Sequence, residues 1–423
     1  MVVARVRSVE LFTGAGGLAL GTHLAGFHHD AVLEYEHNSC CTLRLNTLRG
    51  LDGVDWRVVE EDVRRVEFSN WAVGDEMDLL AGGPPCQPFS LGGKHRGHAD
   101  PRNMFPEAIR AVRELRPRAV LFENVKGIMR PDFRPYFDYI IASLQYPFVL
   151  RIAGETWQDH MARLVSTGMG SDTVPERDRY DVQWQIVNVA NYGVPQVRHR
   201  VFVVGFRHDL SVRWTFPAPT HSRAALLYAQ DVNGSYWEDH NLPRQDGHRR
   251  VASDRWTGSR DASAKPTEKR WQTVRDALRG LPDPRERDDS PGFDSHVGIP
   301  DARSYPGHTG SPWDWPAKAI KAGDHGNPGG ENMLRRDDGS VRYFTVRELA
   351  RLQTFPDDWQ FANSWTESRR QLGNAVPVLM ARTLGERIAA ALQGSSGGNN
   401  PYPLSELEIK QRIAEHFKSH IPT

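Results

Sequence analysis

The stretch from Val6 to Phe27, VRSVELFTGAGGLALGTHLAGF, decides the fold. Its first seven residues form a β-rich run, and the glycine turn TGAGG follows directly. After the turn, apolar residues recur at helical spacing, at Leu18, Leu20, Leu24 and Phe27. The pattern predicts a strand, a glycine turn and a helix, an arrangement in which the backbone can approach a bound ligand closely.

Further strands alternate with helices along the first half of the chain. AVLEY (31–35) and DLLAGG (78–83) are typical of strands, and AVLFENV (119–125) follows a helical segment that closes at Pro117. Each of these strands ends beside polar or reactive residues. The alternation predicts an α/β fold with a doubly wound, Rossmann-like parallel sheet, whose ligands lie beyond the carboxyl ends of the strands.

The composition excludes several classes of protein. The chain has 53 Lys and Arg against 53 Asp and Glu, so any nucleic-acid surface must be local rather than a property of the whole chain. Only 3 cysteines are present, two of them adjacent, which cannot build a disulfide framework and favours a reducing compartment. We expect no signal peptide, no membrane helix and, because no Cys or His cluster has zinc spacing, no metal.

The second half of the chain changes character several times. Residues 151–181 are polar and irregular, which indicates an insertion or a loop, whereas 184–206 resemble two strands joined by a turn. From 207 to 341 Pro, Gly, Arg, Asp and Trp dominate, and residues 241–275 carry 9 Lys and Arg against 4 Asp and Glu. Regular structure returns with Asp338-Gly339 as a hairpin turn, a Thr345-x-x-Glu348 capping box and an Ala/Leu-rich helix at 377–394.

The segment GGPPCQPFS (82–90) carries the most specific chemical signal. Cys86 stands between prolines in a loop after a buried strand, an unusual place for a structural thiol. A thiolate there is a strong nucleophile for conjugate attack on an electron-poor ring. Cys40 and Cys41, at the start of a predicted helix, are interpreted as packing residues. We expect burial to keep Glu123 protonated, as a general acid requires, although a cap or structural acceptor is the alternative.

Two acidic residues are candidates for binding a nucleotide-like cofactor. Glu34 lies 17 residues beyond Gly17 at the end of the second strand, which suits ribose hydroxyls. Asp62 is placed to accept from an adenine amino group, with a solvated surface acid as the alternative. The glycine turn alone is also compatible with other nucleotide sites or with a plain turn.

In their linear order, these motifs resemble the cytosine-C5 DNA methyltransferase family of prokaryotic restriction-modification systems. The resemblance covers nearly the whole chain through FTGAGG, Glu34, Asp62, PPCQPFS, ENV (123–125), QVRHR (196–200), RELARLQTFPDDW (347–359) and QLGNAVPV (371–378). Pro88 departs from the pattern, because many relatives have Gly or Ala there. The resemblance implies S-adenosyl-L-methionine as cofactor and a flipped-out cytosine in double-stranded DNA as substrate.

The resemblance also implies a role for each matching residue. Cys86 corresponds to the nucleophile, Glu123 to the group that protonates the ring at N3, Arg200 to the contact with O2, and Arg198 to a supporting residue. In the cofactor pocket Phe12 stacks on the adenine, Glu34 holds the ribose and Asp62 the adenine amino group, and the pocket is completed by Gly14, Gly16, Gly17, Gly83, Pro84, Asn374 and Val376. For DNA contacts we expect Ser90, Arg249 and Arg250.

These assignments predict a division of the chain and a cellular setting. We expect a catalytic and cofactor-binding domain (1–206), a smaller irregular target-recognition domain (207–341), a C-terminal segment that returns to the catalytic domain (342–394), and a linker with a short helical tail (395–423). We expect a monomer in the cytoplasm, associated with the nucleoid. The resemblance implies either a cognate restriction endonuclease acting on the same site or an orphan role in a prokaryotic or phage setting.

Three other functions are weighed against this one. A tRNA cytosine methylase of the same superfamily typically carries a short recognition region and a Cys-Phe-Thr motif, whereas this chain has a long region and lacks the motif. A non-catalytic cofactor-binding regulator has no reason to keep Cys86, Glu123 and Arg200 together. A dinucleotide oxidoreductase is disfavoured because FTGAGG lacks the full G-x-G-x-x-G spacing.

Overall fold

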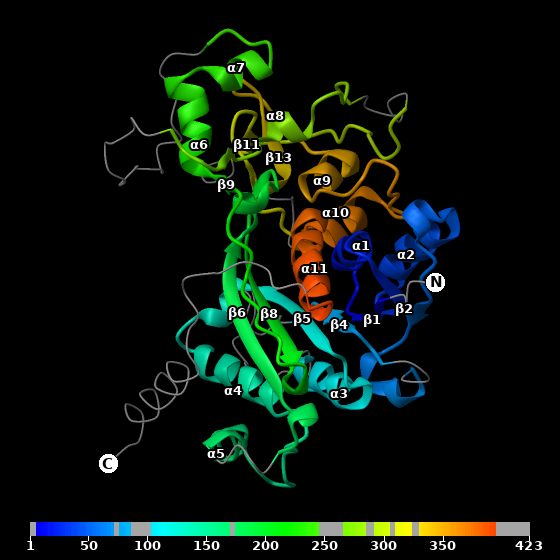
Figure 1. The fold of residues 1–423 in the computed structure, drawn as a ribbon. Coiled ribbons are helices and arrows are strands. Elements are labelled where there is room, and N and C mark those ends of the chain that lie inside the picture. Colours follow the sequence, from blue (N-terminus) through cyan, green and yellow to red (C-terminus); the bar gives the residue numbers. More distant parts are fainter. Residues whose placement is uncertain are drawn as a thin grey trace, which may run out of the picture.

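The computed structural model describes residues 6–71, 76–85, 103–169, 174–244, 265–284, 292–304, 309–323 and 330–394. Among them a seven-stranded sheet forms the centre of the molecule, in the order β3-β2-β1-β4-β5-β8-β6 (Figure 1). Its strands are β1 (Val6–Leu11), β2 (Phe27–Glu34), β3 (Val58–Glu60), β4 (Leu79–Gly82), β5 (Ala119–Val125), β6 (Tyr180–Asn188) and β8 (His199–Arg207). The pairs from β3 to β5 are parallel, but β8 runs antiparallel to β5 and β6. The predicted doubly wound sheet is confirmed, with β8 as the exception to its parallel order.

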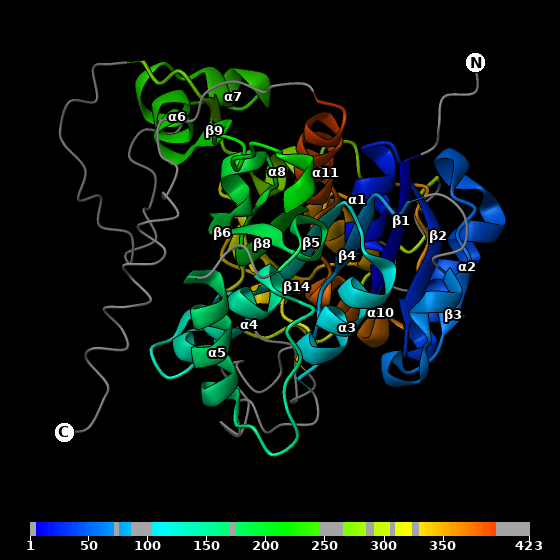
Figure 2. The same cartoon turned by 60° about the horizontal axis from the view of Figure 1, so that its bottom comes forward.

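Helices cover both faces of this sheet (Figures 1 and 2). On one face lie α1 (Gly17–Leu24) and α11 (Val378–Leu392), and on the other α3 (Phe105–Leu115) and α4 (Arg134–Gln145). Strand β5 serves both, because Ala119 and Leu121 pack in the cluster with α1 and α11, whereas Val120 and Phe122 pack in the cluster with α3 and α4. Burial on both faces explains why the strand is a continuous apolar run.

Helices α1 and α11 meet through glycine. A Cβ atom on Gly17 would lie 2.2 Å from the carbonyl oxygen of Val376, and one on Gly21 would lie 2.3 Å from the Cβ of Ala381. Only a residue without a side chain permits this approach. The C-terminal segment therefore packs against the first turn of the fold, although more than 350 residues separate them in sequence.

The expectation of an irregular insertion at 151–181 is wrong in part. This segment contains α5 (Trp157–Met169), which packs on α4 through Tyr139, whose hydroxyl lies 3.0 Å from Nδ1 of His160. Apolar residues do recur at helical spacing here, at Trp157, Met161, Leu164 and Val165, but polar residues between them obscure the pattern. A 13-residue helix therefore stands where the sequence indicated a loop.

A second group of short elements lies beyond the sheet, at the top of Figure 1. It comprises β9 (His221–Ser222), α6 (Arg223–Leu227), α7 (Ser235–Asp239), β10 (Lys269–Arg270), α8 (Val274–Ala277), β11 (Ser311–Pro312), β12 (Ala317–Lys318), β13 (Met333–Arg335) and β14 (Val341–Tyr343). The turn at Asp338-Gly339 joins β13 and β14 as predicted. Among the described residues, 279–284 and 313–316 contain neither helix nor strand, and the domain boundaries stay predictions.

Regular helices follow this group along the chain. Helix α9 (Val346–Leu352) begins with the predicted capping box, because the side chains of Thr345 and Glu348 each bond the other's backbone amide. Helix α10 (Trp365–Asn374) leads into α11, and α2 (His37–Arg49) follows β2. The predicted helical tail at 395–423 lies outside the described residues.

Candidate active site

The ends of β4, β5 and β8 meet at one edge of the sheet. Gly82 of β4 pairs with Phe122, and Val125 at the end of β5 pairs with Arg200 near the start of β8. Oε1 of Glu123 lies 2.7 Å from Nε of Arg200, and the two side chains are only 9% and 15% exposed. Three of the predicted site residues therefore share this edge, because a Cβ on Gly83 would lie 3.5 Å from Oε2 of Glu123.

Two opposing effects set the protonation of Glu123. Burial raises the pKa of its carboxyl group, and the guanidinium of Arg200 acts in the opposite direction. The raised direction prevails because burial is the larger effect. The same burial lowers the pKa of Arg200. The predicted desolvation of Glu123 is confirmed, and its carboxyl group holds a proton more readily than an exposed one.

A hydrogen bond fixes the entry to the PPCQPFS segment. Nδ2 of Asn124 donates to the carbonyl oxygen of Pro84 at 3.0 Å, which ties the chain leaving β4 to the strand that carries Glu123. Pro84 is buried, and Cys86 follows two positions later in the sequence. The predicted nucleophile Cys86 and the predicted DNA contacts Ser90, Arg249 and Arg250 lie outside the described residues.

Arg198 lies near Arg200 in sequence but in a different environment. It is fully buried, and its guanidinium donates to the carbonyl oxygens of Gly373 (2.5 Å), Ala375 (3.1 Å) and Ile320 (3.0 Å). These carbonyls belong to two segments far along the chain. Arg198 therefore joins the start of β8 to the C-terminal part of the protein, the placement of a positioning residue.

Glu34 closes the glycine turn from the end of β2. Its Oε2 accepts from the amide of Gly14 at 2.7 Å, and its Oε1 accepts from the amides of Tyr35 at 2.9 Å and Glu36 at 2.8 Å. Phe12, Gly14 and Gly16 all have positive φ, at 57°, 56° and 89°, so the turn holds a backbone conformation that favours glycine. Burial raises the pKa of Glu34, and these amides act against that shift.

Asp62 has a partner that the sequence interpretation did not include. Its carboxylate caps a short 3-10 helix, Val63–Arg65, by accepting from the Arg64 amide at 3.0 Å, and it accepts again from Nε of Arg64 at 2.9 Å. Hydrogen bonding to the Arg64 side chain lowers the pKa of Asp62 to about 2. An adenine amino group at Asp62 would share the carboxylate with Arg64.

The C-terminal motif completes this side of the site. Asn374 is exposed at the end of α10, and Val376 places its carbonyl oxygen against the glycine turn at Gly17. Nε2 of Gln353 donates to the carbonyls of Leu372 (2.5 Å) and Ala375 (3.1 Å) and so holds the loop between α10 and α11. The structure thus brings the predicted residues of the first and last motifs together.

Two further residues beside the glycine turn were missed. Tyr35 is 74% exposed directly after Glu34, and an exposed aromatic ring at a strand end is suited to stacking on a flat ligand. Glu10 is buried one position before the end of β1, and burial raises its pKa well above the ordinary value while the Ala19 backbone acts against it. For Tyr35, its position in the sequence next to Glu34 was an available signal.

The fold and the site together define a class of protein. A doubly wound sheet with a glycine turn after its first strand and an acidic residue at the end of its second is typical of α/β enzymes that bind a nucleotide-like cofactor at the strand ends. The model of the C-5 cytosine-specific DNA methylase family matches residues 6–146 and 173–390, and the chain belongs to this family. It is a DNA cytosine-5 methyltransferase, of a family that uses S-adenosylmethionine.

Relatives of similar length support this membership. The chain is 32% identical to the Type II methyltransferase M.NgoMIV of Neisseria gonorrhoeae, over 91% of this chain and 98% of that protein. It is 30% identical to the Type II methyltransferase M.PspPI of Psychrobacter sp., over 92% of this chain and 80% of that protein. The solved structure of S. pombe Dnmt2 methyltransferase shares the fold, with a TM-score of 0.53 and 15% identity over 93% of this chain and 100% of that one.

The family match leaves out residues 147–172, so α5 belongs to an insertion, as the irregular sequence there indicated. Within the described ranges, no helix combines the length and the apolar character that a membrane span requires.

Proposed function

We propose that this chain is the modification enzyme of a restriction-modification system, which methylates C5 of a flipped-out cytosine in one specific double-stranded DNA sequence. The observation that carries the proposal is the buried pair of Glu123 and Arg200 at the strand edge where PPCQPFS begins. Support for the setting comes from the curated relatives, which are Type II methyltransferases.

The chemistry follows from the charges at this edge. The cytosine must leave the base stack, at a cost of a few kcal/mol, because stacking inside a duplex covers the ring faces from which C5 and C6 react. The thiolate of Cys86 forms a bond to C6 while Glu123 donates a proton to N3 and Arg200 contacts O2. S-adenosylmethionine, when bound, would supply an electrophilic methyl group to the electron pair at C5, and the bond from that methyl group to sulfur would break to leave a neutral thioether. A base would then take the C5 proton, the Cys86 thiolate would be expelled, and the N3 proton would return to Glu123, which restores the aromatic ring.

We assign the cofactor to the glycine turn and the residues gathered around it. Glu34 would accept from the ribose hydroxyls, because a carboxylate can accept more hydrogen bonds than the three that the backbone amides of Gly14, Tyr35 and Glu36 donate to it. Asp62 would accept from the adenine amino group, and Phe12 and Tyr35 offer aromatic faces. Glycines and C-terminal residues would form the walls, namely Gly14, Gly16, Gly17, Gly83, Pro84, Asn374 and Val376.

The remaining parts of the proposal concern organisation. Residues 207–341 would read the target sequence, with residues 1–206 and 342–394 forming the catalytic body and Ser90, Arg249 and Arg250 contacting DNA. The enzyme would act as a monomer in the cytoplasm, where its DNA lies, and a cognate endonuclease would cut the same sequence when it is unmethylated. The irregular composition of 207–341 and its basic segment 241–275 support this division.

The test is a methylation assay followed by mapping. Purified protein with S-adenosylmethionine and unmethylated genomic DNA should yield 5-methyldeoxycytidine after nuclease digestion, and bisulfite sequencing should show every copy of one short sequence methylated. A transfer RNA substrate serves as the comparison for the alternative superfamily activity. Methyl transfer to the RNA and not to DNA would contradict the proposal, and methylation scattered without a common sequence would contradict the restriction-modification setting.

A further inference from the structure

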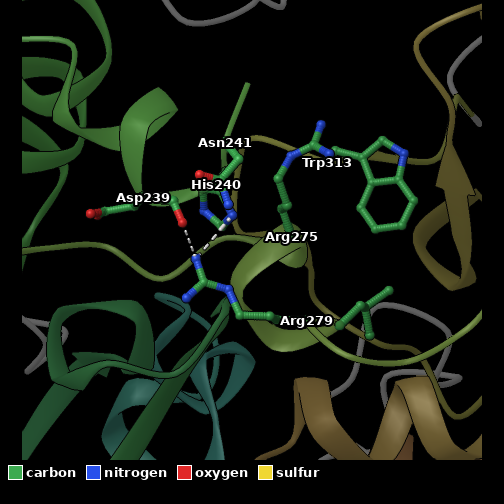
Figure 3. Close-up of a pocket in the computed structure, with 7 residues that line it drawn as sticks. Asp239, His240, Asn241, Arg275, Arg279 and Trp313 are labelled. Carbon is green, nitrogen blue, oxygen red and sulfur yellow. Dashed lines mark hydrogen bonds between the residues drawn. The ribbon is translucent and has the colours of Figure 1, made fainter. Parts of the chain in front are cut away.

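A pocket of about 420 Å³ opens in the region 207–341 (Figure 3). It lies between the end of α7, helix α8 and the segment that leads into β12. Its lining residues are Asp239, His240, Asn241, Arg275, Leu278, Arg279 and Trp313. Polar side chains that can donate and accept hydrogen bonds therefore surround one apolar residue and one aromatic plane.

The wall formed by α8 is held by both backbone and side chains. The amide of Arg275 donates to the carbonyl oxygen of Trp313 at 2.9 Å, and the Arg275 guanidinium lies 5.2 Å from the Trp313 ring centre. Nε and Nη2 of Arg275 donate to the two carboxylate oxygens of Asp314, at 2.6 and 3.1 Å. Because these bonds form before any ligand binds, little conformational entropy is lost when one does.

Two further polar groups line the pocket, Arg279 just after α8 and Asn241 just after α7. Nη2 of Arg279 donates to the carbonyl oxygen of Asp239 at 2.6 Å and lies 3.3 Å from Nδ1 of His240. Burial lowers the pKa of His240, so a neutral ring can accept from Arg279 at Nδ1, while its Nε2 lies 3.1 Å from Oδ1 of Asp276. These contacts use only one of the three guanidinium nitrogens of Arg279, and its Nε and Nη1 form no hydrogen bond with another described residue.

Asn241 is the second polar group that lines the pocket. It is exposed, and its side-chain amide forms no hydrogen bond with another described residue. Its backbone has φ of 52°, the left-handed conformation that asparagine adopts more readily than most residues and that commonly ends a helix, here α7. An amide carries a donor and an acceptor on one plane, which matches the edge of a base.

Carboxylates offset the positive charges around the pocket. Ion pairs join Arg270 to Asp239 and Asp276, and Arg275 to Asp314 and, at 3.9 Å, to Asp337, so the guanidinium groups of Arg270, Arg275 and Arg279 give no excess of positive charge. A phosphate contact requires unbalanced positive charge, whereas a base edge requires matched donors and acceptors. The balance favours a base edge as the occupant.

The chain path places this pocket within reach of the active site. Trp313 lies four residues before Ala317, which pairs with Gln196, and Gln196 lies four residues before Arg200. Each stretch of four residues spans at most about 14 Å. Stacked bases lie roughly 3.4 Å apart along one strand, so the pocket can reach a base within several positions of a cytosine held at Arg200.

We propose that Asn241 and Arg279 contact the edge of one base in the target sequence and determine which base is accepted there. The proposal rests on residues 207–341 being the sequence reader, and it deepens that role by naming the reading side chains.

The test compares Asn241→Ala and Arg279→Lys with the wild-type protein on a DNA library randomised around the methylated cytosine, with the product read by bisulfite sequencing. We expect the preference at one base position to fall roughly 5- to 150-fold, the equivalent of about 1 to 3 kcal/mol, while preferences at other positions stay unchanged. The salt dependence of DNA binding should also stay unchanged. Arg382→Ala is the matched control, because Arg382 is an exposed arginine on α11 that pairs with Glu386.

Two results would overturn the proposal: both variants keeping every preference, or both binding all sequences more weakly with a salt slope lower by about one, which marks a phosphate contact. Thermal unfolding and S-adenosylhomocysteine binding check that each variant is folded. If Arg279→Lys unfolds, Asn241→Ala alone tests the proposal, because the side-chain amide of Asn241 forms no hydrogen bond with another described residue. If the wild-type enzyme methylates the library without any preferred sequence, the proposed function itself is contradicted. The wild-type measurement shows this before any variant is compared.

Discussion

Replacing Arg198 and Arg200 separately should separate stability from catalysis within one short segment. In Arg198→Met the side chain keeps its length but loses its donors, so the carbonyls of Gly373 and Ile320 lose a partner. The carbonyl of Ala375 keeps Gln353 as a donor. Two buried acceptors at roughly 1 to 3 kcal/mol each, partly offset by no longer burying a charge, predict a loss of about 2 to 4 kcal/mol in the free energy of unfolding.

Arg200→Met should behave in the opposite way. Its main partner is Glu123, whose pKa burial already raises, so that carboxyl group can take up a proton when the guanidinium is removed. The free energy of unfolding should therefore fall by only about 1 kcal/mol, while turnover is lost.

Urea unfolding followed by tryptophan fluorescence measures the free energy of unfolding, and methyl transfer at saturating DNA and cofactor measures turnover. The reasoning is refuted if Arg198→Met is as stable as the wild-type protein, or if Arg200→Met is the less stable of the two variants.

Glu123→Gln should lower turnover by about 10²- to 10⁴-fold and leave S-adenosylhomocysteine affinity within a few-fold. Because burial raises the pKa of Glu123, wild-type activity should decline as the pH rises through that raised value. The Gln variant should not show this decline at high pH. Gly17→Ala should abolish cofactor binding in calorimetry, because its Cβ would lie 2.2 Å from the Val376 carbonyl oxygen. A Cβ on Gly14 would have no atom within 4 Å, so Gly14→Ala should cost only about 1 to 2 kcal/mol of backbone strain. Equal effects of the two variants would argue against the close approach of α1 and the C-terminal segment. Exchanging residues 207–341 for those of a relative with another target should move methylation to the new sequence, and an active hybrid that kept its original target would place recognition elsewhere.

Local signals explain what the sequence alone could predict. The strand, glycine turn and helix at 6–27 and the capping box at Thr345 and Glu348 depend on residues within one or two turns of each other, and the structure has them where the sequence places them. The burial of Glu123 was also predictable, because it ends a run of apolar residues in β5.

Features that depend on distant partners could not be predicted in this way. The buried contacts of Arg198 join residues separated by 122 to 177 positions, and no local pattern distinguishes this arginine from Arg200. Alternation of strands and helices predicts parallel strands and does not predict the direction of β8. This strand follows β6 without a crossover helix and runs antiparallel to β5 and β6. The pairing of Asp62 with Arg64 is local, but a charged pair two residues apart is indistinguishable in sequence from two solvated side chains.

The most direct test of the account is covalent trapping at Cys86. Double-stranded DNA with 5-fluorocytosine at the methylated position, incubated with the protein and S-adenosylmethionine, should yield a stable protein–DNA adduct, because fluorine at C5 prevents the elimination that releases the thiolate. Peptide mass spectrometry should place the adduct on Cys86, and Cys86→Ala should form none while still binding cofactor. An adduct on another residue, or methylation by Cys86→Ala at a rate comparable to the wild-type protein, would contradict the assignment of the nucleophile.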